Sequence, residues 1–248
     1  MRIALIMEYD GTRYYGSQLQ DNVPTIQGEL EKAIMAVTGE EIRTAFAGRT
    51  DRGVHAKGQV VAFHTSSSLP VETVVRALNH YLPDDIIATD AFSVRDDFDP
   101  RRDAISREYC YYVWNDKTPS AFSRLNSYFV PQTLEVTSMN EACQFLLGTH
   151  DFISFTSSID GMKNTVRTVY KANIFRFGAM VIFHIVANAF LPHQVLHTMG
   201  ALLRVGFKKI NVPEFYQILQ LKKLASAGPA VPPHGLWLMK VNYAGDAQ

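Results

Sequence analysis

A short segment of the chain places a carboxylate between two guanidinium groups. Residues 47–56 read AGRTDRGVHA, so Asp51 lies in a glycine-punctuated turn with Arg49 and Arg52 beside it. Asp and Gly satisfy turn geometry for local reasons, and the turn by itself therefore indicates no function. A cation within a few ångströms nevertheless keeps a carboxylate ionised, and an ionised carboxylate can act as a nucleophile. These residues are therefore compatible with catalysis by Asp51, but by themselves they do not assign it that role.

Strands and helices are predicted to alternate around this turn. Apolar and β-branched runs predict strands at residues 2–8, 59–64, 108–115 and 236–243, and a hairpin at residues 169–177 and 181–186 around Gly178. Apolar residues at helical spacing predict helices at residues 25–37, 71–82 and 193–205. Ser138 and Glu141 have the spacing of a capping box, which predicts a further helix that ends at Gly148.

The order of these elements predicts the fold class. Each half of the chain mixes strands and helices in a similar order, which indicates an α+β protein of two split β-α-β (ferredoxin-like) lobes. A polar stretch at residues 96–104, which contains Pro100, is the predicted boundary. We therefore expect an N-terminal lobe over residues 1–103, which carries the Asp51 turn, and a C-terminal lobe over residues 104–248.

Composition limits the class of protein. Hydrophobic residues make up 47% and charged residues 19% of the 248 residues, and these are the values of a folded globular chain. No segment approaches the ~20 apolar residues of a membrane span, so we expect a soluble protein without a membrane segment or a signal peptide. The net charge is zero, and any binding of nucleic acid must therefore come from a local basic patch.

The two cysteines, Cys110 and Cys143, lie in apolar patterns and not in Cys-x-x-Cys or Cys/His spacing. This arrangement argues against a zinc site and against a disulfide framework. We therefore expect no metal site, and the cysteine usage fits the reducing cytoplasm.

Residues 48–63, GRTDRGVHAKGQVVAF, resemble the signature of the tRNA pseudouridine synthase A family, in which the aspartate is the nucleophile. The resemblance continues along the whole chain in the family's order. The similar segments are YDGTRYYGSQLQ, TIQGELEKAI, FDPRRDAISREYCYYVWN, TVRTVY, ANAFLPHQVLHTMGALLRVG and PPHGLWLMKVNY. The resemblance implies two α+β lobes that form a continuous antiparallel sheet with a central basic cleft.

The same resemblance implies a function. Family members act as homodimers on tRNA, and they convert uridines at positions 38 to 40 of the anticodon stem-loop to pseudouridine. The reaction breaks the N1 to C1′ bond, turns the base and rejoins it through C5, so it requires neither a redox cofactor nor an energy source. A carboxylate suffices, either by adding to the base or by capturing or deprotonating the sugar.

The resemblance also suggests residues that hold the substrate. Tyr109 matches the active-site tyrosine that packs against the flipped base, and Leu236 matches the opposite wall of the base pocket, although a core leucine is nearly as good a description. Arg49, Arg101 and Arg167 match family arginines. The candidates for contact with RNA are the basic residues on the motif segments, Arg49, Arg52, Lys57, Arg101, Arg102 and Arg107.

The sequence departs from the family pattern in two places. Leu196 stands where the family has the arginine that pairs with the catalytic aspartate, and His193 and His197 lie beside it. Ser17 stands where the G-W-Q pattern has Trp, and we expect this change to affect packing near the entrance loop. His55, inside the signature, is as consistent with a structural role as with a catalytic one.

Leu196 motivates an alternative function, a tRNA-binding homologue with weakened or lost catalysis. The presence of both Asp51 and Tyr109 argues against it. A small-molecule hydrolase that depends on Asp51 is a more distant alternative. The sequence does not support it, because it contains no paired carboxylates, no metal-ligand cluster and no G-x-S-x-G motif.

Overall fold

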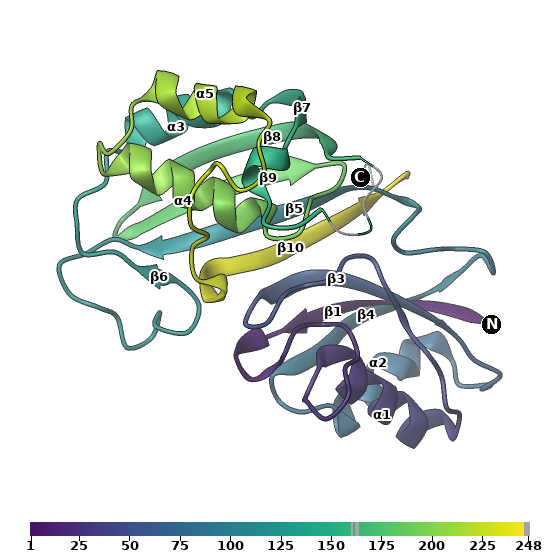
Figure 1. Cartoon of the computed structure of the whole chain (residues 1–248). Coiled ribbons are helices and arrows are strands. Elements are labelled where there is room, and N and C mark those ends of the chain that lie inside the picture. The colour runs from purple at the N-terminus through teal and green to yellow at the C-terminus, as the bar shows by residue number, and fades with distance from the viewer. Residues whose placement is uncertain (160, 162–163, 246–248) are drawn as a thin grey trace. The chain divides into compact units, whose positions relative to one another are not determined.

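The computed structural model describes residues 1–159, 161 and 164–245. The chain forms two compact units, each a β-sheet with helices (Figure 1). Unit 1 consists of Met1–Ile105 together with the C-terminal segment that starts at Trp237, and unit 2 consists of Ser106–Leu236. The predicted α+β class is confirmed.

Unit 1 contains two helices and a sheet in the order β4-β1-β3-β10, with β2 paired to β3. Its elements are β1 (Arg2–Tyr9), α1 (Ile26–Thr38), β2 (Ala45–Phe46), β3 (His55–His64), α2 (Val71–Tyr81), β4 (Ile86–Val94) and β10 (Leu236–Tyr243). A short 3-10 helix, Gly11–Arg13, follows β1. Both α-helices pack against one face of this sheet (Figure 1).

Local sequence explains where α1 begins and ends. The Thr25 hydroxyl accepts a hydrogen bond from the Gly28 amide, so it caps the first turn. Gly39 ends the helix in the left-handed region with φ 75°, which a residue without a β-carbon adopts at little cost. Between these signals Ile26, Leu30 and Ile34 form a stripe that is at most 1% exposed.

Unit 2 contains a sheet in the order β5-β9-β8-β7, with β6 paired to β5. Its elements are β5 (Ala104–Trp114), β6 (Tyr128–Phe129), α3 (Val136–Gln144), β7 (Gly148–Asp151), β8 (Val166–Phe177), β9 (Met180–Ala187), α4 (Gln194–Gly206) and α5 (Val212–Leu221). Gly178 turns the β8–β9 hairpin with φ 57°, as the sequence predicts. Almost every residue of α4 is buried, so this helix lies at the centre of the unit's core.

The capping box predicted at Ser138 and Glu141 is wrong. The helix begins at Val136, and Glu135 at its N-cap makes no side-chain capping hydrogen bond. Instead the Glu135 amide donates to the Gly206 carbonyl at the end of α4 (3.0 Å). The start of α3 is therefore set by packing against α4, a tertiary contact that local spacing does not reveal. The helix also ends earlier than predicted, because irregular turns follow Gln144 before β7 begins at Gly148.

Two strand pairs differ from the antiparallel arrangement that the resemblance implies. β10 pairs with β3 in parallel, and β6 pairs with β5 in parallel. The first of these pairs also changes the division of the chain. Residues 237–245 belong to unit 1, where Trp237 and Leu238 pair with β3, and not to the lobe expected over residues 104–248.

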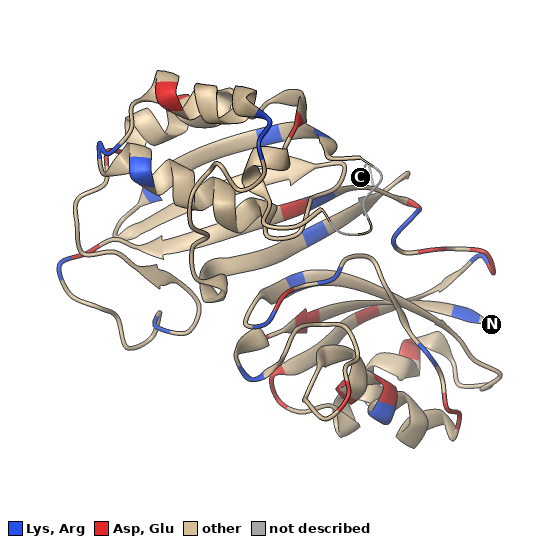
Figure 2. Ribbon diagram, viewed as in Figure 1, with Lys and Arg blue, Asp and Glu red and all other residues tan. Residues whose placement is uncertain are grey.

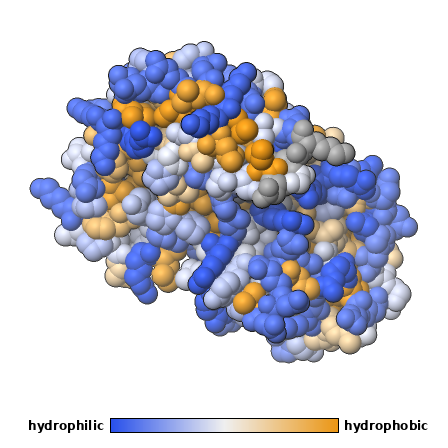
Figure 3. All heavy atoms as spheres, in the orientation of Figure 1, coloured by the Kyte–Doolittle hydropathy of each residue, from blue (hydrophilic) through white to orange (hydrophobic). Residues whose placement is uncertain are grey.

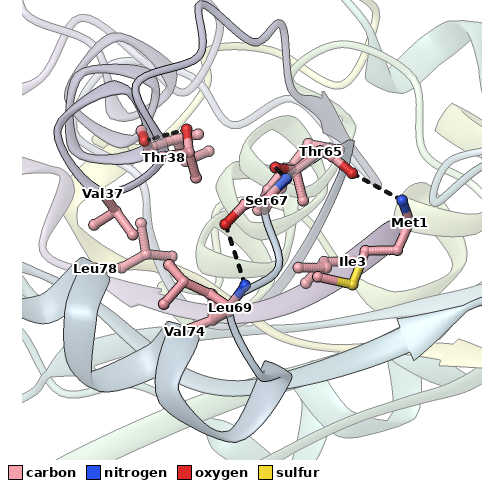
Figure 4. Close-up of a pocket in the computed structure, with 11 residues that line it drawn as sticks. Met1, Ile3, Val37, Thr38, Thr65, Ser67, Leu69, Val74 and Leu78 are labelled. Atoms are coloured by element: carbon pink, nitrogen blue, oxygen red, sulfur yellow. Dashed lines mark hydrogen bonds between the residues drawn. The ribbon is translucent and has the colours of Figure 1, made fainter.

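Unit 1 holds a small, mainly apolar pocket between its helices and its sheet (Figure 4). Ile3, Val37, Leu69, Val74 and Leu78 are among the residues that line it. The lining contains no carboxylate, imidazole or guanidinium group. The pocket is therefore a gap in core packing and not a site of acid, base or nucleophilic chemistry.

The surface of the protein is mixed in polarity. Lys, Arg, Asp and Glu are spread over both units, in agreement with the net charge of zero (Figure 2). Apolar side chains reach the surface over α3 and α5, where Phe145, Tyr216 and Leu221 are exposed (Figure 3). Within the described residues, no helix has both the length and the apolar character that crossing a membrane requires.

The parallel pairing of β10 with β3 depends on Gly58. A β-carbon at this position would lie 2.5 Å from the Met239 carbonyl oxygen, which belongs to the backbone and cannot rotate away. We predict that Gly58→Ala lowers the free energy of unfolding by ~1–3 kcal/mol, the usual cost of overpacking. Denaturant titration measures this change. Gly48→Ala is the matched control, because a β-carbon there meets nothing within 4 Å, and equal stability of the two variants would contradict the prediction.

Candidate functional site

Asp51 lies at an exposed turn between two buried residues. The turn joins β2 to β3, and Thr50 and Val54 are buried on either side of the exposed residues Asp51 and Arg52. The Val54 amide donates to the Asp51 carbonyl (3.1 Å), and Gly53 has φ 78°, a conformation that favours glycine. The sequence therefore produces a tight turn that presents the Asp51 carboxylate at the surface while its two ends are held in the core.

Thr50, the residue before Asp51, is held by hydrogen bonds from two segments, the one around Ser17 and the end of β1. Its amide donates to the Ser17 hydroxyl (2.8 Å), and its carbonyl accepts from the Ser17 amide (3.0 Å). Its side-chain hydroxyl lies 2.8 Å from the Tyr9 hydroxyl. The Gln59 side-chain amide donates to the Tyr9 hydroxyl (3.3 Å) and to the Gly48 carbonyl (2.8 Å). Burial raises the pKa of Tyr9 to about 12, so its hydroxyl stays protonated at neutral pH.

The other end of the turn is fixed by close packing. The Gly11 amide lies 3.1 Å from His55 Nδ1, and the His55 ring stacks on Trp237 with 4.5 Å between centroids. A β-carbon on Gly11 would lie only 2.0 Å from the Val54 carbonyl oxygen. His55 is fully buried. This environment gives His55 a structural role in holding the turn.

Three basic residues on the Asp51 turn and on β3 differ from several other cations of unit 1. Arg13, Lys32, Arg43, Arg95 and Arg102 each form a salt bridge with a carboxylate. Among the contacts of the described residues, Arg49, Arg52 and Lys57 form none.

Two of these three cations contact aromatic rings instead. The Arg52 guanidinium lies 4.2 Å from the centroid of the Tyr15 ring, and Lys57 Nζ lies 5.8 Å from that of Trp237. Both cations are exposed, as is Arg49. Cations that no carboxylate neutralises keep their charge for an anionic ligand, and phosphate is such a ligand.

Arg101 and Arg102 lie in the turn that follows β4. Both of their amides donate to Asp99 Oδ1 (2.9 Å each), and the Arg102 guanidinium forms a salt bridge with Asp99 Oδ2 (2.8 Å). The side chain of Arg101 is exposed. The charge of Arg102 is thus balanced by Asp99, which weakens this residue as a candidate for contact with RNA.

The remaining candidates lie in unit 2. Tyr109 on β5 is 9% exposed, and its ring meets that of Phe190 edge to face, with 5.1 Å between centroids. Arg107 donates to the Asn188 carbonyl (2.9 Å), and Leu236 is buried. The predicted site residues thus form two groups. Asp51, Arg49, Arg52, Lys57 and Arg101 belong to unit 1, while Arg107, Tyr109 and Leu236 belong to unit 2.

Leu196, the departure from the family's arginine, is a buried residue of α4. The two histidines beside it are already bonded in unit 2. His197 Nδ1 lies 2.8 Å from the Gly228 carbonyl, and His193 Nδ1 lies 2.8 Å from the Ser157 hydroxyl. Arg204, eight residues after Leu196, donates to the Ala227 carbonyl (3.3 Å). The Arg204 side chain therefore binds the same loop as His197.

Sequence reasoning missed Tyr9 and Gln59, and it expected Ser17 to affect only packing. All three lie within segments already singled out for other reasons. A buried tyrosine and a buried glutamine in adjacent strands require hydrogen-bond partners, and this requirement was the available signal. Within the part of the chain that the structure describes, no group of three or more His, Cys, Asp or Glu residues could hold a metal ion.

Comparison with known proteins identifies the class. The family model described as tRNA pseudouridine synthase matches residues 5–101 and 142–244, which is most of the chain. The chain belongs to this family.

Individual relatives align with this chain over almost their whole length. A protein named tRNA pseudouridine synthase A from Acetivibrio thermocellus is 41% identical over 97% of this chain and 99% of its own. Its namesake from Pseudothermotoga lettingae is 37% identical over 98% of this chain and 99% of its own. A chain of the solved Cbf5-Nop10-Gar1 complex is 13% identical, with a TM-score of 0.35 over 83% of this chain and 55% of that chain, and a likeness this weak carries no conclusion.

The close approach of Gly11 to Val54 predicts how the Asp51 turn responds to a small substitution. Gly11→Ala should push the turn outward, because the Val54 carbonyl is backbone and cannot yield. We predict that trypsin then cleaves after Arg49 and Arg52 faster, relative to cleavage after Arg76 within α2. Mass spectrometry of the fragments measures both sites in the same digest. A variant in which the ratio stays at the wild-type value would show that the turn does not depend on this contact.

Proposed function

We propose that this protein is an isomerase that converts uridine to pseudouridine in tRNA, with the Asp51 carboxylate as its nucleophile. The observation that carries the proposal is the exposed carboxylate of Asp51 on a turn whose ends are buried and hydrogen-bonded. Family membership and the names of the relatives support the reaction and the substrate.

The chemistry fits the side chains near Asp51. The isomerisation breaks the N1 to C1′ bond, turns the base and forms a C5 to C1′ bond, while C5 loses a proton and N1 gains one, so atoms and electrons balance without a cofactor. Asp51 attacks either the base or the sugar, or it deprotonates the sugar as the base leaves. Arg49 and Arg52 favour the ionised form of the carboxylate, because opposite charge nearby stabilises it.

The uridine must leave its stack before Asp51 can reach it. Unstacking costs a few kcal/mol, which a binding pocket must offset. We assign one wall of that pocket to Tyr109 and the opposite wall to Leu236, the roles that the family resemblance implies. The edge-to-face contact with Phe190 supports the role of Tyr109, because it limits the orientations that the ring can adopt.

The exposed cations are the proposed contacts to the tRNA backbone. Arg49, Arg52 and Lys57 suit this role because none of them is neutralised by a described carboxylate. Arg101, which matches a family arginine, and Arg107, a basic residue on a motif segment, extend the set. Phosphate contacts of this kind position the RNA, while the base is recognised in its pocket.

The resemblance supplies two finer points, and the cysteine usage supplies a third. We propose that the targets are uridines at positions 38 to 40 of the anticodon stem-loop, that the enzyme acts as a homodimer, and that it works in the cytoplasm. The alternative of weakened or lost catalysis gains no support from the relatives, which are named as synthases. We therefore regard Leu196 as a substitution within an active enzyme.

Asp51→Asn tests the nucleophile directly. The amide keeps the volume of the carboxylate but is a far weaker nucleophile, so we predict that pseudouridine formation in an anticodon stem-loop is abolished. The affinity for tRNA should stay within a few-fold, because the phosphate contacts remain. Mass spectrometry of the nucleosides measures the product, and filter binding measures the affinity. Asp21→Asn, which alters an exposed carboxylate elsewhere in unit 1, should keep wild-type turnover, and appreciable product from Asp51→Asn would refute the assignment.

Arg49→Ala and Arg101→Ala test the proposed phosphate contacts. Each variant should bind tRNA more weakly, and its plot of log affinity against log salt should be shallower by ~0.7–0.9 for each phosphate that the variant no longer neutralises. Arg43→Ala is the matched control, because its guanidinium is salt-bridged to Glu31 at 2.9 Å and should contribute nothing to the salt dependence. If all three slopes equal that of the wild type, Arg49 and Arg101 do not contact the RNA backbone.

A further inference from the structure

Ser17 connects the first turn of α1 to the Asp51 turn. The Gln27 amide donates to the Ser17 carbonyl (3.0 Å), and the Ile26 amide donates to the Gly16 carbonyl (3.3 Å). The segment is thus fixed by a helix whose own position is set by the core. Ser17 itself is fully buried, so no water competes for its hydroxyl.

The contact between Ser17 and Thr50 leaves little freedom on either side. Both backbone polar groups of Thr50 are bound by Ser17, and its side-chain hydroxyl is bound by Tyr9. The neighbouring Gly16 has φ 100°, and a β-carbon there would lie 2.8 Å from the Thr50 carbonyl oxygen. Thr50 directly precedes Asp51 in the chain, and its amide, carbonyl and hydroxyl groups are all hydrogen-bonded. The position of the Asp51 backbone is therefore restricted.

We propose that Ser17, together with Tyr9, is a positioning residue for the catalytic step, and that it acts on Asp51 through Thr50. This inference rests on the proposed function. It concerns a position where the sequence departs from the family pattern, since a tryptophan side chain offers only a donor and cannot accept the hydrogen bond from the Thr50 amide. The serine hydroxyl is the acceptor that this chain supplies.

Removal of that acceptor should disturb the reaction more than the binding of tRNA. A buried amide without an acceptor is costly, so the turn would shift to find another partner or water. Displacement of a reacting group by about 1 Å can slow a reaction ~100-fold. The exposed cations that we assign to the phosphates lie on flexible side chains, and they tolerate such a shift.

The test compares the rate of pseudouridine formation under single-turnover conditions with the affinity for tRNA. Ser17→Ala should lower the rate about 10- to 100-fold and leave the affinity within about twofold. Ser17→Thr, which keeps a hydroxyl, should restore most of the rate. Tyr9→Phe removes the second hydroxyl without adding volume, so it provides an independent variant if Ser17→Ala does not fold.

A double variant distinguishes positioning from general destabilisation. Ser17→Ala and Tyr9→Phe both act through Thr50, so their combined effect on the rate should be smaller than the product of the single effects. Ser154→Ala is the matched control, because Ser154 is a fully buried serine of unit 2. It should leave the single-turnover rate unchanged, whatever its effect on the melting temperature.

The outcomes separate this inference from the proposed function. Wild-type protein that forms no pseudouridine overturns both. Active wild-type protein with full single-turnover rates in Ser17→Ala and Tyr9→Phe overturns the positioning role alone. A rate reduction that appears equally in Ser154→Ala, or that is matched by an equal reduction in affinity, also overturns it, because the serine would then support only the fold or the binding surface.

Discussion

The hydrogen bonds around Thr50 are the constraint on which the candidate site depends. A catalytic carboxylate must be exposed to its substrate and yet have a defined position, and these requirements oppose each other on a surface turn. The structure reconciles them by burying Thr50 directly before Asp51 and pairing its polar groups with Ser17 and Tyr9. Buried polar groups cost free energy unless they are paired, so this arrangement disfavours any displacement of the turn.

The hydrogen bonds around Thr50 involve both the sheet and the helix layer of unit 1. Tyr9 ends β1, Gln59 lies on β3, and Ser17 is anchored at the first turn of α1. The sheet and the helix packed on it therefore meet at one residue of the turn. Gly11 and His55 provide a second point of attachment, where backbone atoms approach so closely that no side chain fits between them. The packing of the core of unit 1 thus fixes the position of the Asp51 turn at its surface.

The distribution of charge near Asp51 differs from the net charge of the whole chain. The chain carries as many acidic as basic residues, and several cations of unit 1 are paired with carboxylates. Two exceptions, Arg52 next to Asp51 and Lys57 on β3, contact aromatic rings, which hold a cation without cancelling its charge. A protein with zero net charge can therefore present a basic surface to RNA, because only the charges within about a Debye length of the phosphates matter.

The sequence by itself determined the elements whose signals are local. Periodicity located β1, β3, β5, β8, β9 and β10 and most helices, but not β4 or α5. Gly178 marked a turn with positive φ, and the resemblance of the AGRTDRGVHA segment to the family signature identified Asp51 as the candidate nucleophile. Only the tertiary structure decided that α3 starts at Val136, that β10 joins β3 in parallel, and that Tyr9, Ser17 and Gln59 meet around Thr50. Tyr9 and Ser17 are 41 and 33 residues from Thr50 in the chain. Their pairing arises from the packing of β1, α1 and β3, and no local spacing of residue types encodes which distant donors and acceptors that packing brings together.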